Sequence, residues 1–225
     1  MRAPTGLESS PAPIINITNA PAWRGWTVVA LVLGMTACAD GGGALSAGDT
    51  VVAVVRHAER SPGGDNPDLA AAGLARAESL VDAVRDLSID AVYSTDFCRT
   101  AQTGQPTAEA MAARMLILAT GSRAAGLGSC SPAIAVAHDS GGPATASELA
   151  SRILSDHGGE AVLVVGHSNT VPALVAELAG RSVCPDPIEL QEGECMLPET
   201  AYGDLFIVRI PSAGETTIER RRFGT

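Results

Sequence analysis

Thr50-Val51-Val52-Ala53-Val54-Val55-Arg56-His57-Ala58-Glu59 is the stretch of this sequence that decides the fold. Its first six residues form a β-branched, mostly apolar run, which is typical of a strand buried in a parallel sheet. Open α/β sheets bind their ligands just beyond the carboxyl ends of their strands. Because Arg56 and His57 stand at such an end, we expect them to lie in a binding site.

The same pattern occurs at two further strand ends. The run at 161–165 leads through a glycine into His167, and the run at 91–94 is followed closely by Arg99. Two histidines and two arginines therefore follow predicted strands. Guanidinium groups bind phosphate in a two-pronged fashion and imidazoles can attack phosphorus, so this combination suits phosphoryl transfer.

The remaining pattern alternates helices with strands. Asp68 is the expected N-cap of the first helix, and Thr145-Ala-Ser-Glu148 has the form of a capping box. The alternation predicts an α/β fold of three layers, a mainly parallel sheet with helices on both faces. Helices are expected at about 69–87, 100–114, 145–157 and 170–179, further strands at 115–119, 205–210 and 217–222, and irregular loops at 121–142 and 181–201.

Composition limits the class of protein. The 225 residues are 46% hydrophobic but only 3% aromatic, which is enough for one aliphatic core. The formal charge is -10 and the basic residues are not clustered, which argues against nucleic acid or an anionic membrane surface as a partner.

The N-terminal segment differs from the rest of the chain. Arg24 precedes the apolar run 26–35, which is followed by Thr36-Ala37-Cys38. This is the pattern of a secretory signal, and the run is too short to span a bilayer. The end of the segment resembles the bacterial lipobox, which implies lipidation of Cys38; an ordinary cleaved signal with an incidental cysteine is the alternative. We expect a lipoprotein-type signal at 1–37, a flexible tether at 38–49 and one folded domain at 50–225, exported to the periplasmic or cell-surface side of a bacterial membrane.

Export also affects the interpretation of the remaining cysteines, which are Cys98, Cys130, Cys184 and Cys195. An even number of cysteines in an oxidising compartment favours disulfides. Of the three possible pairings we favour Cys98–Cys130 with Cys184–Cys195. A zinc site is not supported by any CxxC or HxxxH spacing, and we expect no metal.

Four segments together resemble one family. They are Val55–Glu59, Leu69–Ala77, Ser94–Thr103 and Gly166–Val171. In this order they resemble the histidine phosphatase superfamily, in the branch that contains cofactor-dependent phosphoglycerate mutases and small phosphohistidine phosphatases. The resemblance covers about residues 50–180 and implies a phosphoglycerate mutase-like fold that needs no cofactor.

The resemblance assigns roles to four residues. His57 is the expected nucleophile, which carries the phosphoryl group as a covalent intermediate. Arg56 and Arg99 are expected to neutralise the phosphoryl oxygens, and His167 to donate to them when it is protonated. Backbone amides near Ser168, at a helix start, would add to the anion pocket.

Other polar residues near the first strand leave alternatives open. Arg60, in Arg-His-Ala-Glu-Arg-Ser-Pro62, also resembles the signature of the acid phosphatase and phytase branch, which implies a third phosphate-binding arginine. Glu59 either orients His57, supplies the proton of the leaving group, or is an ordinary loop charge. The proton donor is otherwise unassigned, and His138 and His157 are expected to be non-catalytic.

These patterns predict an exported, lipid-anchored phosphohydrolase that acts on a small phosphomonoester or phosphoamidate. Inorganic phosphate would occupy the same pocket, and the lipid anchor would be the sole contact with a membrane. A non-catalytic lipoprotein that binds a phosphorylated ligand is the alternative.

Overall fold

The computed structural model describes residues 48–121, 126–135, 138–139, 145–181, 190–191 and 194–224. The chain divides into two units, 1–43 and 44–225, and all described residues belong to the second. The expected signal at 1–37, Cys38 and most of the expected tether lie outside the described residues. Within the described ranges, no helix has the length and apolar character needed to cross a membrane.

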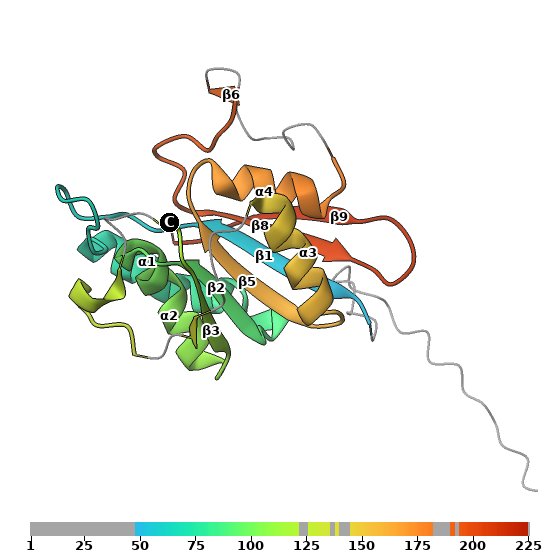
Figure 1. Cartoon of the computed structure of the whole chain (residues 1–225), viewed down its shortest axis with the longest axis horizontal. Coiled ribbons are helices and arrows are strands. Elements are labelled where there is room, and N and C mark those ends of the chain that lie inside the picture. Colours follow the sequence, from blue (N-terminus) through green and yellow to red (C-terminus); the bar gives the residue numbers. More distant parts are fainter. Residues whose placement is uncertain are drawn as a thin grey trace, which may run out of the picture. The chain divides into compact units, whose positions relative to one another are not determined.

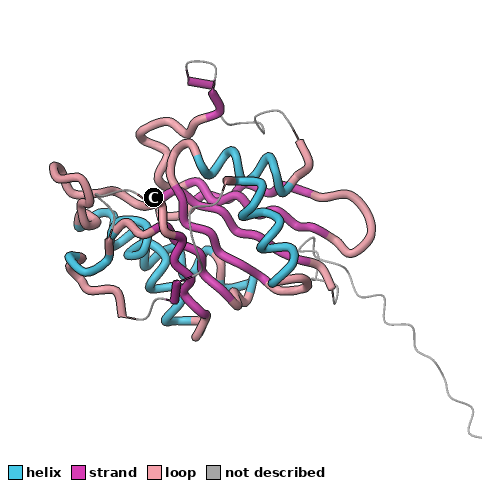
Figure 2. Tube along the Cα trace, viewed as in Figure 1, coloured by secondary structure: helices cyan, strands magenta, loops and turns pink. Residues whose placement is uncertain are grey.

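The second unit is built on a seven-stranded sheet with the order β4-β3-β2-β5-β1-β8-β9. In this sheet, drawn in magenta in Figure 2, strands β1 to β5 run parallel to one another, whereas β8 is antiparallel to β1 and β9 is antiparallel to β8. The mainly parallel α/β sheet is thereby confirmed. The strands are β1 (Thr50–Arg56), β2 (Ala91–Thr95), β3 (Arg114–Leu118), β4 (His138–Asp139), β5 (Ala161–Gly166), β8 (Asp204–Ile210) and β9 (Thr217–Arg222), and a separate small hairpin joins β6 (Leu190–Gln191) to β7 (Glu194–Cys195).

Four helices cover the sheet in two pairs: α1 (Ala71–Ala83), α2 (Cys98–Ala110), α3 (Ala146–Asp156) and α4 (Thr170–Leu178). Successive side chains of a strand point to opposite faces. In β1, Val51 and Val55 belong to the apolar cluster that includes α1 and α2, whereas Val52 and Val54 belong to the cluster of α3 and α4. Both faces of β1 are therefore buried, which explains its unbroken apolar run. Figure 1 shows α3 and α4 in front of the sheet.

Of the two helix N-caps predicted from the sequence, one is confirmed and the other is wrong. Thr145 is the N-cap of α3, and its capping box with Glu148 is present. Asp68, however, does not cap α1, whose N-cap is Ala70 without a side-chain hydrogen bond. The carboxylate of Asp68 instead accepts hydrogen bonds from Gln102 Nε2 (2.8 Å) and from the backbone of Ser131 (2.9 Å). The tertiary contacts of Asp68 thus replace the local cap that the sequence suggests.

Two segments that were expected to be irregular contain short strands. His138 stands in β4, which pairs with β3, and β6 and β7 form a hairpin within 181–201. A strand of two residues has no room to display an alternating pattern, so pairing with a distant segment decides its structure.

Two of the cysteines lie beside the second helix. Cys98, at the start of α2, and Cys130 form a disulfide. Cys195 is also disulfide-bonded, and Cys184, its expected partner, lies outside the described residues.

Candidate active site

The polar residues that follow β1, β2 and β5 lie together at the carboxyl ends of these strands. Strand β5 lies between β1 and β2, and Arg56 pairs with Gly166 in the parallel register. The backbone N–H of His57 donates to the carbonyl of Gly166 (3.0 Å). As a result the rings of His57 and His167 lie 5.5 Å apart, measured between centroids.

His57 has the environment of a nucleophile. Its side chain is buried, and Nδ1 lies 2.8 Å from the carbonyl oxygen of Ala58. Because a carbonyl only accepts hydrogen bonds, a neutral imidazole in this contact carries its proton on Nδ1 and leaves the lone pair on Nε2. The pKa of His57 is lowered to about 3, chiefly by burial and also by the nearby His167, Arg56 and Arg99. The imidazole is therefore neutral and nucleophilic at pH 7.

Helix α2 holds the backbone that follows His57. The N–H of Ala58 donates to Thr103 Oγ1 (2.9 Å), and this hydroxyl donates to the carbonyl of Arg99 (2.7 Å). Thr103 is fully buried. It therefore couples the position of the nucleophile to the first turn of α2, which carries Arg99.

His167 is held by two threonines. Its Nε2 lies 3.0 Å from Thr95 Oγ1, and its backbone N–H donates to Thr170 Oγ1 (2.8 Å). Burial lowers the pKa of His167 to about 4, and Arg99 and Arg56 act in the same direction. A phosphoryl anion beside it would favour the protonated form, because an opposite charge stabilises the imidazolium. His167 is thus suited to become a donor once substrate is bound.

A cavity of about 370 Å³ opens beside the two histidines. His57, His167 and Ser168 line it together with Arg60 and Arg99. Burial lowers the pKa of Arg99, as do the positive charges of Arg60 and Arg56. Several cations close to one another repel, so an anion in this cavity would relieve an unfavourable interaction.

Arg56 is placed differently from Arg99. Its Nη1 donates to the carbonyls of Pro198 (2.9 Å) and Glu199 (3.1 Å), and its guanidinium lies 4.5 Å from the centre of the Tyr202 ring. Arg56 is not among the residues that line the cavity, although its charge reaches both histidines. Its Nε is buried without a hydrogen-bond partner. Arg56 therefore anchors the segment at 198–202, also through the ion pair of its Nη2 with Glu199 (3.7 Å).

Glu59 is not free for either of the catalytic roles considered for it. It receives hydrogen bonds from Arg76 at both oxygens, the shortest being 2.6 Å from Nη2. These bonds hold the pKa of Glu59 below its usual range. A carboxylate that is held ionised by Arg76 neither orients His57 nor supplies a proton. Glu59 instead connects the segment after β1 to α1 through its ion pair with Arg76.

Asp65 is a site residue that the sequence did not single out. It lines the cavity with His57 and Arg99, on the loop that follows β1. Gly63 and Gly64 on this loop have positive φ angles of 82° and 73°, a backbone conformation that favours glycine. The loop is rich in Pro, Gly, Asp and Asn. This composition predicts a turn, but it does not indicate which side chain of the loop lines the cavity.

His157 lies outside this cavity. It follows α3, is buried, and contacts Glu160 Oε2 through Nδ1 (2.7 Å) and Tyr93 OH through Nε2 (3.1 Å). It therefore has a structural role at the amino end of β5. The backbone of His138 belongs to β4.

The donor set at the cavity is not that of a metal centre. Among the described residues, the group of three potential ligands that comes close enough to hold an ion is Asp68, Cys98 and Cys130. Its two sulfurs are joined in the disulfide.

A buried neutral imidazole, facing a cationic cavity beyond the ends of parallel strands, defines the class of phosphoryl-transfer sites that work through a histidine nucleophile. Residues 52–120 match the model of the histidine phosphatase superfamily (branch 1).

Several solved structures resemble this chain at low sequence identity. A candidate alpha-ribazole-5'-P phosphatase from Escherichia coli K-12 is 14% identical, with a TM-score of 0.50 over 77% of this chain and 96% of that one. An ecdysone phosphate phosphatase from Bombix mori, in complex with tungstate, is 14% identical with a TM-score of 0.48 over 76% and 97%. The open reading frame Rv3214 from Mycobacterium tuberculosis is 19% identical with a TM-score of 0.47 over 78% and 99%. None of the curated protein sequences matches this chain.

Proposed function

We propose that this protein is an exported, metal-independent phosphohydrolase that acts on a phosphomonoester or phosphoamidate through a phosphohistidine at His57. The observation that carries the proposal is the state of His57. Its imidazole is neutral, its Nδ1 is occupied by the carbonyl of Ala58, and Nε2 remains for the cavity that Arg60 and Arg99 make cationic.

The reaction proceeds in two displacements. In the first, the Nε2 lone pair of His57 attacks phosphorus, the bond to the leaving oxygen or nitrogen breaks, and the leaving atom takes the electron pair and a proton. In the second, water attacks phosphorus and gives a proton to the group that protonated the leaving atom, the P–N bond breaks with its electron pair returning to Nε2, and phosphate leaves as the neutral imidazole is restored. Arg99 and Arg60 neutralise the phosphoryl oxygens throughout, and His167 donates to them once the bound anion has raised its proton affinity.

Asp65 is the residue proposed to protonate the leaving group. Among the described residues it is the carboxylate that lines the cavity. Glu59 is held ionised by Arg76, and Asp96 accepts hydrogen bonds from the backbone and hydroxyl of Thr120 at 3.0 and 2.8 Å. Asp65 is exposed on its loop, so it can regain a proton from water after each turnover.

The Asp65→Asn variant should lose activity according to the leaving group. A general acid contributes roughly 10²-fold or more when the leaving group is a poor one. We therefore expect kcat/KM for an alkyl phosphate to fall about 10²-fold, while p-nitrophenyl phosphate, whose phenolate needs no proton, is hydrolysed almost as fast as by the wild type. Glu59→Gln is the matched control, and it should not change the ratio of the two rates. Equal losses on both substrates would assign Asp65 another role.

A chromogenic assay separates the phosphatase from the alternative, a non-catalytic phosphate-binding lipoprotein. The full-length protein is incubated with p-nitrophenyl phosphate, with and without vanadate. We expect release of p-nitrophenolate that vanadate inhibits, because vanadate adopts the five-coordinate geometry of phosphoryl transfer. Binding of vanadate with no turnover of any phosphate ester would favour the binding protein.

Chelation should leave the activity unchanged. The described lining of the cavity offers imidazoles, guanidinium groups and a single carboxylate, Asp65, whereas Mg²⁺ and paired zinc sites require clustered carboxylates. We expect the same kcat before and after dialysis against EDTA. Loss of activity with recovery on adding one divalent ion would overturn the metal-independent mechanism.

The export part of the proposal rests on the sequence of residues 24–38, and its test is fractionation. If Cys38 is lipidated, acyl chains at ~0.8 kcal/mol per buried CH₂ would hold the enzyme on the membrane. Expressed in a bacterium, the protein should partition with membranes and become soluble when Cys38 is replaced with serine. Wild-type protein found in the cytoplasm with Met1 intact would reject both export and lipidation.

A further inference from the structure

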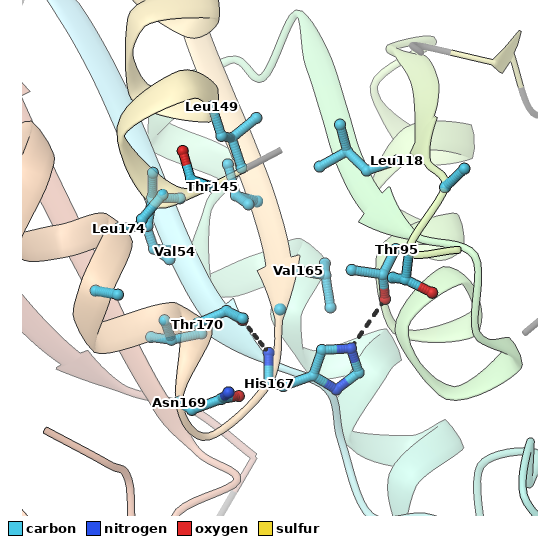
Figure 3. Close-up of a pocket in the computed structure, with 17 residues that line it drawn as sticks. Val54, Thr95, Leu118, Thr145, Leu149, Val165, His167, Asn169, Thr170 and Leu174 are labelled. Carbon is cyan, nitrogen blue, oxygen red and sulfur yellow. Dashed lines mark hydrogen bonds between the residues drawn. The ribbon is translucent and has the colours of Figure 1, made fainter. Parts of the chain in front are cut away.

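A second cavity adjoins the catalytic site on the face of the sheet that α3 and α4 cover. Its volume is about 390 Å³, within the range of pockets that bind small organic molecules. Leu149 of α3 and Leu174 of α4 form one side, and Val54, Val165 and Leu118 line it from the ends of three strands (Figure 3). We call it the apolar pocket.

The lining of the apolar pocket is mostly apolar, and its polar side chains besides His167 are Thr95, Thr120, Thr145, Asn169 and Thr170. At His167, Nε2 lies 3.0 Å from Thr95 Oγ1, and Thr170 Oγ1 accepts from the backbone of His167 (Figure 3). No Asp, Glu, Lys or Arg occurs among the described residues that line it. The pKa of His167 is lowered to about 4, so this residue is also uncharged at pH 7 when no anion is bound. Polar or charged molecules would gain few partners inside the pocket.

His167 is the residue that the apolar pocket shares with the cationic cavity. Its ring therefore marks where the two adjoin. A phosphoryl group held by Arg99 would lie on one side of this imidazole, and an apolar surface lies on the other. Cavities of this size with a mostly apolar lining are typical binding sites for small organic molecules. Because this one is partly open to solvent and begins at a catalytic side chain, a part of the substrate can enter it.

We propose that the apolar pocket binds the hydrocarbon part of the substrate's leaving group, and that the substrates are phosphomonoesters of apolar alcohols. This inference rests on the proposed function, because it takes the cationic cavity as the phosphoryl site. An alkyl chain or a ring fits the mostly apolar lining, whereas the polyol of a sugar phosphate would place many of its hydroxyl groups against apolar side chains there. The cationic cavity sets the affinity for phosphate, and the apolar pocket selects among phosphate esters.

The test measures binding without turnover. Full-length His57→Ala protein, which lacks the nucleophile but keeps every residue of the apolar pocket, is titrated by calorimetry with n-alkyl phosphates from ethyl to octyl. Burial of a methylene is worth up to about fourfold in affinity. We expect the dissociation constant to fall about two- to fourfold for each added methylene until the pocket is full. An affinity that does not change with chain length would overturn the inference.

Two variants of the lining locate the binding. Leu149→Asn places an amide in the pocket, and Leu154→Asn, on the exposed side of the same helix, is its matched control. Ala173→Phe fills the pocket from an exposed position, so it keeps the test available if Leu149→Asn fails to fold. In each pocket variant, made in the His57→Ala background, the dissociation constant of the alkyl phosphates should no longer fall with chain length. The affinity for inorganic phosphate should stay the same. A dependence that survives both Leu149→Asn and Ala173→Phe would contradict the proposal.

The outcome for the phosphatase itself is read separately. Wild-type turnover of p-nitrophenyl phosphate tests the proposed function, whereas the titrations test the pocket. If the wild type hydrolyses the ester but the affinity for alkyl phosphates does not change with chain length, the inference about the pocket is wrong and the proposed phosphatase function stands. If the affinity rises with chain length but no ester is hydrolysed, the pocket is supported and the hydrolytic function is refuted.

Discussion

The His57→Ala variant is expected to lose phosphatase activity by several powers of ten while keeping its fold. Alanine removes the Nε2 atom that forms the bond to phosphorus, so no covalent intermediate can form, and each factor of ten corresponds to about 1.4 kcal/mol of lost transition-state stabilisation. The fold should persist, because among the described residues the side chain of His57 hydrogen-bonds to the carbonyl of the next residue alone, and the backbone bond to Gly166 remains. Steady-state kinetics and a thermal melt measure the two effects.

A second histidine provides the control. His157 is as deeply buried as His57 but lies beyond α3, bonded to Tyr93 and Glu160. His157→Ala should lower the melting temperature and leave the activity of the folded fraction near that of the wild type. A His57→Ala protein that retains more than about a tenth of the wild-type activity would refute the assignment, since a covalent route should lose far more.

The Arg99→Ala variant should show the second largest loss, about 10²- to 10³-fold in kcat. Arg99 lines the cationic cavity, and removing one donor that stabilises a charged transition state costs about this much. Arg99→Lys should recover part of the loss, because it restores the charge but not the planar fork. Vanadate affinity should fall with kcat, because both depend on the five-coordinate phosphoryl group.

An exposed arginine serves as the control for Arg99. Arg85 forms a surface ion pair with Asp82, far from the cavity lining, and Arg85→Ala should leave kcat unchanged. If Arg99→Ala raises KM and leaves kcat intact, Arg99 contributes only to ground-state binding, and Arg60 or Arg56 would have to stabilise the transition state.

The sequence predicted those parts of the fold in which local pattern and tertiary packing agree. The apolar run of β1 is unbroken because both faces of the strand are buried, and the capping box at Thr145 is satisfied within its own helical turn. Asp68 failed as a predicted cap because Gln102 and Ser131, which are distant in sequence, bind its carboxylate. Strand β4 was missed because two residues carry no periodicity.

In the candidate site too, the residues predicted correctly are those that a local pattern specifies. His57, His167 and Arg99 were found because parallel strands end at one edge of the sheet, so residues that follow neighbouring strands meet there. The ion pair of Glu59 with Arg76 and the backbone contacts of Arg56 depend on how α1 and the segment at 198–202 fold back onto the site. Asp65 depends on the path of a glycine-containing loop. No local sequence pattern specifies these three placements.

The central claim is that His57 carries the phosphoryl group, and its most direct test is to trap that intermediate. The enzyme is mixed with a radiolabelled phosphate ester, quenched in alkali within one turnover, and digested for mass spectrometry, because phosphohistidine survives alkali and is lost in acid. The proposed mechanism predicts one acid-labile phosphoryl group on the peptide that contains His57, formed as fast as the leaving group is released and absent from His57→Ala. Turnover without a labelled protein, or with the label on His167, would contradict it.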